Sequence, residues 1–224
     1  MAEKQRSETG QFVSTLPLRA VYIDRLITPK RYKNKKTGKE EGEPKFGCTL
    51  LASPDLDVLK AMKVAVLAVA QEKWPGIQAK DIQAPFKSGD KVADKAKTAD
   101  KDPKAWARGF VTMAVSSVHQ PRLSVLDKGG IIDLKEPEQI ALYKKHFYNG
   151  VDVFVELNFV PYESDLGGME IKGVTAYINQ CVVTGKGGKI ELGTRSAADT
   201  FGSYVGAYTN VDPYAGADAS DDFQ

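Results

Sequence analysis

The chain has 224 residues and a formal net charge of +2, a length that suits one well-buried domain with insertions. Hydrophobic residues make up 42% of it and charged residues 27%, which excludes a wholly disordered or fibrous protein. It contains no run near the roughly 20 apolar residues of a membrane span, and its first residues lack the apolar centre of a signal peptide, so we expect a cytoplasmic protein with no membrane partner.

The first predicted elements are a mobile arm and a long β-hairpin. Residues 1–16 are polar and aperiodic, which indicates a flexible N-terminal arm. The runs Leu18–Ile27 and Lys45–Leu51 are rich in β-forming residues, and the second alternates apolar with polar or small side chains. Residues 28–44 between them hold closely spaced lysines and turn-forming residues, so we expect a projecting basic loop.

A helix of about 20 residues is predicted next, because apolar residues recur at three- and four-residue spacing. Ser53 is suited to the N-cap, Pro54 to the first helical position, and Pro75-Gly76 to the end. The apolar stripe consists of Leu59, Met62, Val66, Ala70 and Trp74. Such a stripe packs on a core far more often than it binds a cofactor, so we interpret Trp74 as structural.

Residues 81–108 are rich in Lys, Asp, Ala and Pro and follow no convincing period, which predicts a long, partly ordered insertion. Loops of this length inside a domain usually have a functional reason. A basic loop that faces nucleic acid would be one.

Strands return at Gly109–Ser117, Val151–Val160 and Ile171–Thr184, with a helix at Pro137–His146. The predicted order is a hairpin, a helix and then further strands with turns. This is the order of a small Greek-key barrel with a helix across its end. We therefore predict a mainly β domain over residues 17–203, an OB-fold-like five-stranded Greek-key barrel with one or two packed helices. A β-sandwich is the alternative.

The solvent-facing side of these strands carries aromatic residues. In Val151–Phe159 the odd positions are apolar, and the even positions, which include Phe154, are assigned to solvent. The same alternation assigns Phe110 and Tyr177 outward in their strands. The other outward positions are Thr112, Ala114, Thr175 and Asn179. The inward positions of the last strand are Val174, Ala176, Ile178 and Val182. Alternatively, one of these aromatic rings lies under the helix or the insertion.

Rings and positive charges together predict a surface for single-stranded nucleic acid. Unpaired bases stack on aromatic rings for about 1–3 kcal/mol per base, while Lys and Arg neutralise the adjoining phosphates. The predicted stacking residues are Phe110, Phe154, Tyr162 and Tyr177. The predicted phosphate contacts are Tyr32, Lys33, Lys45, Arg108 and Arg122. No segment combines a basic face with a strong apolar moment, so the pattern favours nucleic acid over a membrane surface.

Enzymatic chemistry, metals and cofactors are not predicted. The chain has only two histidines and no recognisable zinc, acyl-transfer or nucleotide motif. We interpret Gly185–Lys189 as a hairpin turn, and Glu163 and Asp165 as solvated carboxylates of a Gly-rich turn. Cys48 and Cys181 lie in apolar runs, which indicates buried free thiols.

Charge is divided unevenly along the chain. Residues 1–195 hold all 31 basic and 24 of the 29 acidic residues, a net +7, whereas residues 196–224 hold five acidic residues and no basic one. This asymmetry is a pointer to nucleic-acid interaction. Residues 204–224 are low in aliphatics and predict a disordered acidic tail, which competes for the basic surface, binds partner proteins or only aids solubility. The tail residues expected to contact partners are Asp218, Asp221, Asp222 and Phe223.

Several short segments are distinctive when they are taken together. They are Gly42–Phe46, Phe147–Gly150, Asn158–Tyr162, Gly173-Val174, Ile178–Gln180, Gly193–Arg195 and Ala197–Phe201. With them the chain resembles, over nearly its whole length, a family of phage single-stranded DNA-binding proteins long catalogued as a domain of unknown function. That family is similar in fold to the DNA-binding protein of T7-like phages, an OB-fold whose acidic, aromatic-ended tail recruits replication proteins. Here Gln224 follows the aromatic Phe223.

The resemblance implies a protein that binds single-stranded DNA without sequence preference during phage DNA replication or recombination, in the cytoplasm of the bacterial host. It implies no enzymatic activity and no cofactor, and its partners would be single-stranded DNA and phage or host replication proteins. The oligomeric state, monomer or dimer, stays open. Two other interpretations are a virion structural or assembly protein, and a nucleotide-processing enzyme with a metal ion at Glu163 and Asp165.

Overall fold

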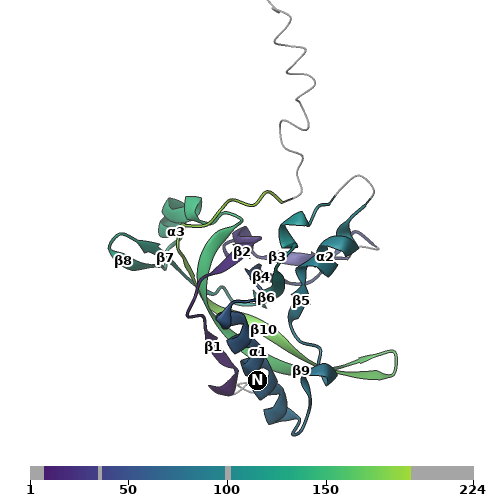
Figure 1. The fold of residues 1–224 in the computed structure, drawn as a ribbon. Coiled ribbons are helices and arrows are strands. Elements are labelled where there is room, and N and C mark those ends of the chain that lie inside the picture. The colour runs from purple at the N-terminus through teal and green to yellow at the C-terminus, as the bar shows by residue number, and fades with distance from the viewer. Residues whose placement is uncertain (1–7, 35–36, 99–101, 193–224) are drawn as a thin grey trace, which may run out of the picture. The chain divides into compact units, whose positions relative to one another are not determined.

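The structure is a computed structural model that describes residues 8–34, 37–98 and 102–192. Its central strands are β2 (Leu18–Val21), β4 (Glu40–Ala52), β6 (Val111–Ser117), β9 (Val151–Leu166) and β10 (Met169–Val183). They close into a barrel in the order β2, β4, β6, β10, β9 and back to β2 (Figure 1). Neighbours in this barrel are antiparallel except β6 and β10, which are parallel. The predicted OB-fold barrel is confirmed, and the β-sandwich alternative is wrong.

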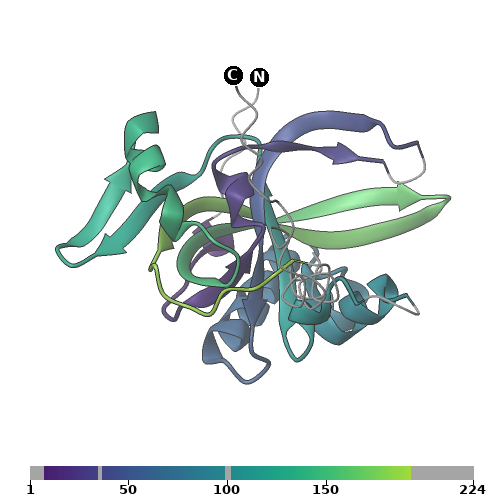
Figure 2. The ribbon, with the colours of Figure 1, turned by 90° about the horizontal axis from the view of Figure 1, so that it is seen from above.

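Shorter strands extend the barrel sheet. They are β1 (Gln11–Val13), β3 (Lys30–Lys33), β5 (Phe86–Ser88), β7 (Arg122–Asp127) and β8 (Gly130–Leu134). β1 pairs with β9, β3 with β4, β5 with β6, and β7 with β10, while β8 completes a hairpin with β7. The β3–β4 ribbon and the β9–β10 hairpin extend beyond the barrel on the same side (Figure 2). In OB folds these two connections, with the face of the second and third strands, bind oligonucleotides.

The N-terminal strand β1 corrects the predicted flexible arm of residues 1–16. The strand pairs with β9, and the Phe12 ring packs with its centre 6.1 Å from that of Phe159. Because Phe12 lies against the core, the described part of the predicted arm belongs to the domain. Residues 1–7 of that arm lie outside the described residues. So do residues 193–224, which include the end of the predicted domain and the predicted tail.

The described residues form three α-helices and several short 3-10 helices. The α-helices are α1 (Asp57–Lys73), α2 (Gly89–Ala96) and α3 (Pro137–Tyr143). The 3-10 helices are η1 (Glu8–Gly10), η2 (Ile23–Leu26), η3 (Ala79–Asp81), η4 (Ala105–Ala107) and η5 (Lys144–His146). α1 buries the predicted stripe, with Trp74 packed against the core, but it begins later than expected because the Leu56 N–H donates to the Ser53 carbonyl in a turn. Within the described ranges, no helix is long and apolar enough to cross a membrane.

Two segments before α1 differ from their predicted form. The first strand, predicted over Leu18–Ile27, ends at Val21, because Tyr22 has a left-handed backbone and η2 follows it. The predicted basic loop of residues 28–44 is a two-stranded ribbon, since it contains β3 and the start of β4. Its strand residues are exposed on both faces, so no alternation of burial marks them in the sequence.

Alternating burial along β9 confirms its predicted inward face. The apolar residues at the odd positions of 151–159 are at most 2% exposed, and Phe154 between them is half-buried. Two residues that we assigned to solvent are buried. Asn158 lies against η1, and the Thr112 hydroxyl donates a hydrogen bond to the Lys87 carbonyl of β5.

A β-bulge reverses the alternation in β10. Its register with β9 shifts after Ile178, so Cys181 and Val183 face the core, and Val182, which we predicted inward, is half-buried on the outer face. Cys48 and Cys181 are buried free thiols, as predicted. Burial raises the pKa of the Cys48 thiol to about 12 and also raises that of Cys181, so both thiols stay protonated.

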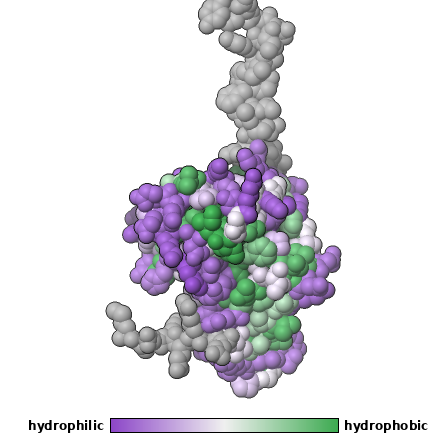
Figure 3. Space-filling model, turned by 90° about the vertical axis from the view of Figure 1, so that its left-hand side faces the viewer, coloured by the Kyte–Doolittle hydropathy of each residue, from purple (hydrophilic) through white to green (hydrophobic). Residues whose placement is uncertain are grey.

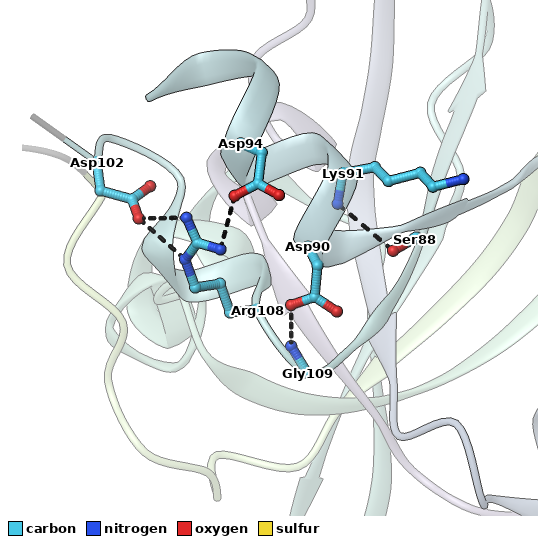
Figure 4. Close-up of polar contacts among 7 residues, drawn as sticks. All are labelled: Ser88, Asp90, Lys91, Asp94, Asp102, Arg108 and Gly109. Carbon is cyan, nitrogen blue, oxygen red and sulfur yellow. Dashed lines mark hydrogen bonds and ion pairs between the residues drawn. The ribbon is translucent and has the colours of Figure 1, made fainter. Parts of the chain in front are cut away.

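The described residues of the insertion 81–108 are more ordered than predicted, because contacts near its end close it on itself (Figure 4). The Gly109 N–H donates to Asp90 at 3.1 Å, which joins the start of α2 to the residues before β6. Gly89 lies so close to η4 that any side chain there would collide with the Ala107 carbonyl. Such contacts depend on tertiary proximity and leave no period in the sequence.

The segment Gly185–Lys189 is not the predicted hairpin turn, because no strand follows it within the described residues 102–192. It runs back along the start of β9 instead. The Asp152 N–H donates to the Lys186 carbonyl at 2.8 Å, and the Tyr148 hydroxyl donates to the Gly187 carbonyl at 3.0 Å. The glycines therefore serve close backbone packing and not a turn between strands.

Candidate nucleic-acid interface

A groove of about 1400 Å³ lies between the β3–β4 ribbon, η2 with its preceding residue, and the outer face of β4 and β6. Residues 29–33, 40–49 and 114–116 line it together with Tyr22 and Arg25. We name it the ribbon groove. Its position over the second and third barrel strands is the one at which OB folds bind oligonucleotides.

The floor of the ribbon groove is made of small side chains. Thr49 pairs with Ala114, and Gly47 pairs with Ser116, across β4 and β6. A side chain at Gly47 would collide with the Val115 carbonyl, so the two strands approach closely there. These small residues leave the outer face of the sheet open to a bulky ligand.

Three residues predicted to contact nucleic acid, Tyr32, Lys33 and Lys45, line the ribbon groove. The Tyr32 side chain is 64% exposed, which leaves its ring available for stacking. Lys33, Lys45 and the neighbouring Arg31 form no ion pair with the residues that the structure describes. Their charges are therefore available to an anionic ligand.

Acidic residues moderate the charge of the ribbon groove. Glu40, Glu41 and Glu43 line it beside five basic residues, which leaves a small positive excess. One of the five, Lys30, is already paired with Asp24 at 2.9 Å. Such a surface attracts a phosphate backbone, but salt readily screens this attraction.

Tyr177 of β10 continues the groove face onto the next barrel strand. It pairs with Ser116 of β6 and is 36% exposed. Its predicted outward position agrees with this exposure. A nucleic acid strand that lay along β4 and β6 would next reach the ring of Tyr177.

Phe154 and Arg122 lie on another part of the outer face, and neither lines the ribbon groove. Phe154 is half-buried and stands opposite Val182 on β10. Arg122 is paired with Glu156 at 3.3 Å, although 73% of its side chain is exposed. Both residues would meet a nucleic acid only if it continued from the groove across β10.

Arg108 and Phe110 also lie outside the ribbon groove lining. The Arg108 guanidinium is 2.8 Å from Asp102 and 2.9 Å from Asp94 (Figure 4), and hydrogen bonds to these carboxylates raise its pKa above the ordinary value. Its charge is thus used within the insertion. Phe110 is half-buried, and its carbonyl accepts the Gly89 N–H at 2.8 Å.

Tyr162 packs against the barrel on its β10 side. Its ring lies over Gly173, in the space that a side chain there would fill, and its hydroxyl donates to Gln83 at 3.0 Å. Gln83 is itself joined to β10, because its N–H donates to the Lys172 carbonyl at 2.8 Å. Tyr162 therefore clamps the segment around Gln83 to the barrel, and one face of its ring is closed to a base.

Sequence patterns missed two residues that line the groove, Tyr22 and Arg25, and a third, Trp106, that contacts Tyr22. The Arg25 guanidinium lies 4.8 Å from the centre of the Tyr22 ring, and Trp106 of η4 meets the same ring edge-on at 5.8 Å. We assigned Tyr22 to the interior of a strand and Trp106 to an insertion without a period, so no alternation pointed to either.

Glu163 and Asp165, considered above as a metal site, do not form a ligand cluster. Glu163 accepts a 2.6 Å hydrogen bond from the Trp74 indole and pairs with Lys73 at 3.4 Å, and both partners lower its pKa. Asp165 accepts the Gly168 N–H at 2.7 Å. Among the residues described, no group of three or more His, Cys, Asp or Glu residues could hold a metal ion.

An apolar band occupies a different surface. Figure 3 views the protein from the side on which β1, β7 and β8 lie in Figure 1, and shows apolar side chains gathered between hydrophilic margins. The exposed large apolar residues of these strands are Val13, Leu126 and Ile131. They do not line the ribbon groove, so they add no stacking surface to it.

A closed five-stranded barrel with an open, weakly basic groove over its second and third strands defines an OB-fold protein suited to a nucleic acid strand. A family model described as the single-stranded DNA-binding protein of Enterobacter phage Enc34 matches residues 21–212. The chain belongs to this family, which confirms the resemblance inferred from its sequence. The predicted tail contacts Asp218, Asp221, Asp222 and Phe223 lie outside the described residues.

Solved structures of the phage Enc34 protein share the fold at low sequence identity. The single-stranded DNA-binding protein from bacteriophage Enc34 is 16% identical, with a TM-score of 0.56 over 89% of this chain and 97% of that one. The same phage protein in complex with single-stranded DNA is 18% identical, with a TM-score of 0.51 over 87% and 97%. The single-stranded DNA-binding protein gp2.5 of bacteriophage T7 is 14% identical, with a TM-score of 0.45 over 84% and 93%. No curated protein sequence matches this chain.

Proposed function

We propose that this protein binds single-stranded DNA in the ribbon groove, without sequence preference, during phage DNA replication or recombination in the bacterial host cytoplasm. Membership of the phage family supports this ligand, and a relative of the same fold has been solved in complex with single-stranded DNA. The observation that carries the proposal is the exposed Tyr32 ring beside three cations, Arg31, Lys33 and Lys45, that have no ion pair in the described part of the chain.

The chemistry of the groove suits a single strand better than a duplex. Aromatic rings stack only on bases whose faces are open, and each such contact contributes about 1–3 kcal/mol whatever the base. The small floor residues allow bases or backbone to lie against the sheet, while the ribbon places cations at the wall. Binding of this kind needs no base-specific hydrogen bonds.

The predicted contacts divide into three groups on this proposal. The groove contacts are Tyr32, Lys33 and Lys45, with Tyr177 next to them on β10, and we add the neighbouring Arg31. Phe154 and Arg122 would extend the site across β10 and β9 if the bound strand is long enough. We assign structural roles to the remaining predicted residues, Arg108, Phe110 and Tyr162, because their side chains or backbones hold the insertion and the barrel together.

Fluorescence polarisation with a labelled oligothymidylate tests the proposal. If the three unpaired cations neutralise three phosphates, log affinity should fall against log salt with a slope of about −2. Lys33→Ala or Lys45→Ala should each reduce that slope by about 0.7. Lys128→Ala, in the exposed β7–β8 turn, is the matched control and should change nothing. Absence of binding at low salt, or preference for duplex, would reject the proposal.

We propose further that the protein acts by binding alone, without a cofactor, and that its acidic tail docks replication proteins. The support for the tail is the charge division along the sequence, a net +7 in residues 1–195 against five acids and no basic residue in 196–224. A virion assembly protein would instead form stable oligomers with no affinity for DNA. Size-exclusion chromatography with light scattering, run with and without the oligonucleotide, distinguishes the two.

A further inference from the structure

Tyr22 stands out by its backbone. Among the non-glycine residues that the structure describes, it alone has a positive φ, at 58° with ψ 30°. A side chain makes this left-handed conformation costly, and residues held in it concentrate at binding sites, where the surrounding structure enforces it. The turn at Tyr22 ends β2, so its ring leaves the in-and-out alternation of that strand.

Asn149 enforces this conformation. Its side-chain oxygen accepts a hydrogen bond of 2.6 Å from the Tyr22 N–H. The residue after it is fixed to the same strand, because the Gly150 N–H donates to the Ala20 carbonyl at 2.7 Å. The segment Phe147–Gly150, which is distinctive in the sequence, therefore holds the backbone of Tyr22 in place.

The Tyr22 ring is not used to fill the core. It is half-buried, lines the ribbon groove, and is not among the side chains that pack in or against the apolar core. Arg25 lies over the ring at 4.8 Å, and Trp106 supports it edge-on with an interplanar angle of 82°. Trp106 belongs to η4, which the neighbouring Arg108 fixes through its ion pairs.

We propose that Tyr22 and Arg25 form a nucleobase subsite in the ribbon groove, positioned by Asn149 and Trp106. This inference rests on the proposed function, since it names where one base of the bound DNA stacks. Arg25 is exposed, and a cation–π contact at an exposed site is weak. When a base stacks on the Tyr22 ring, Arg25 moves to the adjoining phosphate, so the subsite binds both parts of one nucleotide.

Two strands with the same phosphates test the subsite: an oligothymidylate, and an abasic deoxyribose phosphodiester of equal length. Tyr22→Asn removes the ring but keeps a residue that tolerates a left-handed backbone. It should lower affinity for the oligothymidylate at least about fivefold and leave affinity for the abasic strand unchanged. Tyr22→Phe keeps the ring and should bind both strands normally. Lys33→Ala is the contrasting control, because loss of a phosphate contact should weaken binding of both strands.

Fluorescence gives a second readout that does not depend on a Tyr22 variant. The chain has two tryptophans, so Trp74→Phe leaves Trp106 as the remaining one. Oligothymidylate should change its emission, and the abasic strand should not. Equal effects of the two strands on this emission, or equal affinity losses in Tyr22→Asn, would overturn the subsite and leave DNA binding intact. Failure of the unsubstituted protein to bind either strand would overturn the proposed function itself.

Discussion

The indole N–H of Trp74 donates a 2.6 Å hydrogen bond to Glu163, which ties the end of α1 to the β9–β10 hairpin. Lys73 completes the contact, since its ammonium group lies 3.4 Å from the same carboxylate and 5.1 Å from the centre of the Trp74 ring. In an OB fold this hairpin is one of the two connections that flank the binding face. α1 therefore fixes an element next to the proposed DNA site.

Glu163 should make stability depend on pH in the acid range. The hydrogen bond from Trp74 and the charge of Lys73 lower its pKa in the folded protein below the ordinary value of 4.5. The carboxylate thus stabilises the fold above the unfolded-state pKa, and this contribution is lost as the pH falls through the lowered folded pKa. In calorimetric scans, Glu163→Gln should melt below the unsubstituted protein at neutral pH and converge with it in acid. A melting difference that is the same at every pH would contradict this role.

Arg108→Ala should loosen the insertion without changing the salt dependence of DNA binding. The guanidinium holds Asp94 of α2 and Asp102 together, so its loss should speed hydrogen exchange of the α2 amides. Lys45→Ala provides the opposite pattern, a reduced salt slope with α2 protection unchanged. If Arg108→Ala itself reduced the slope by about 0.7, Arg108 would contact a phosphate, as we expected from the sequence.

Strand alternation predicted the barrel well wherever the register is regular. β9 keeps one register with β2, and the odd residues of 151–159 face the core, as expected. β10 gains a bulge after Ile178, and neither glycine nor proline marks it, so Val182 was assigned to the wrong face. A period-two argument fails for every residue beyond such a bulge.

The candidate site was predictable where its signal is local. Lys33 and Tyr32 lie close together in a basic segment, so composition alone indicated them. Arg108 finds one partner, Asp94, 14 residues away, and Tyr22 depends on Asn149 at a separation of 127 residues. Contacts over such separations depend on the finished fold, and no local pattern in the sequence reports them.

Tyr177→Ala should weaken binding of oligothymidylate by about 1–3 kcal/mol, because the exposed ring continues the groove onto β10. Its thermal stability should change by no more than about 0.5 kcal/mol, as for other surface substitutions. Phe154→Ala should cost less affinity, since Phe154 lies outside the ribbon groove. Equal losses of affinity in the two variants, measured by polarisation, would instead indicate that the bound DNA strand extends over β9.

Deletion of residues 205–224 should tighten DNA binding, most clearly at low salt. The deleted segment carries four acidic residues and no basic one, so it competes with phosphates for the cations of the ribbon groove if it reaches them. Replacing Asp218, Asp221 and Asp222 by Asn in the full chain is the matched control for charge. Unchanged affinity in both variants at low salt would leave the tail a docking or solubilising role only.

Asn149→Ala should impair stacking at the proposed Tyr22 subsite although Asn149 does not line the groove. The substitution removes the acceptor of the Tyr22 N–H, which lets the strained backbone relax and moves the ring. Affinity for oligothymidylate should therefore fall relative to that for the abasic strand. Asn149→Asp keeps an acceptor oxygen and should restore the ratio of the two affinities found in the unsubstituted protein. Loss of stability alone would weaken binding of both strands equally. An unchanged ratio of the two affinities in Asn149→Ala would therefore mean that Asn149 supports the fold and does not position the ring of Tyr22.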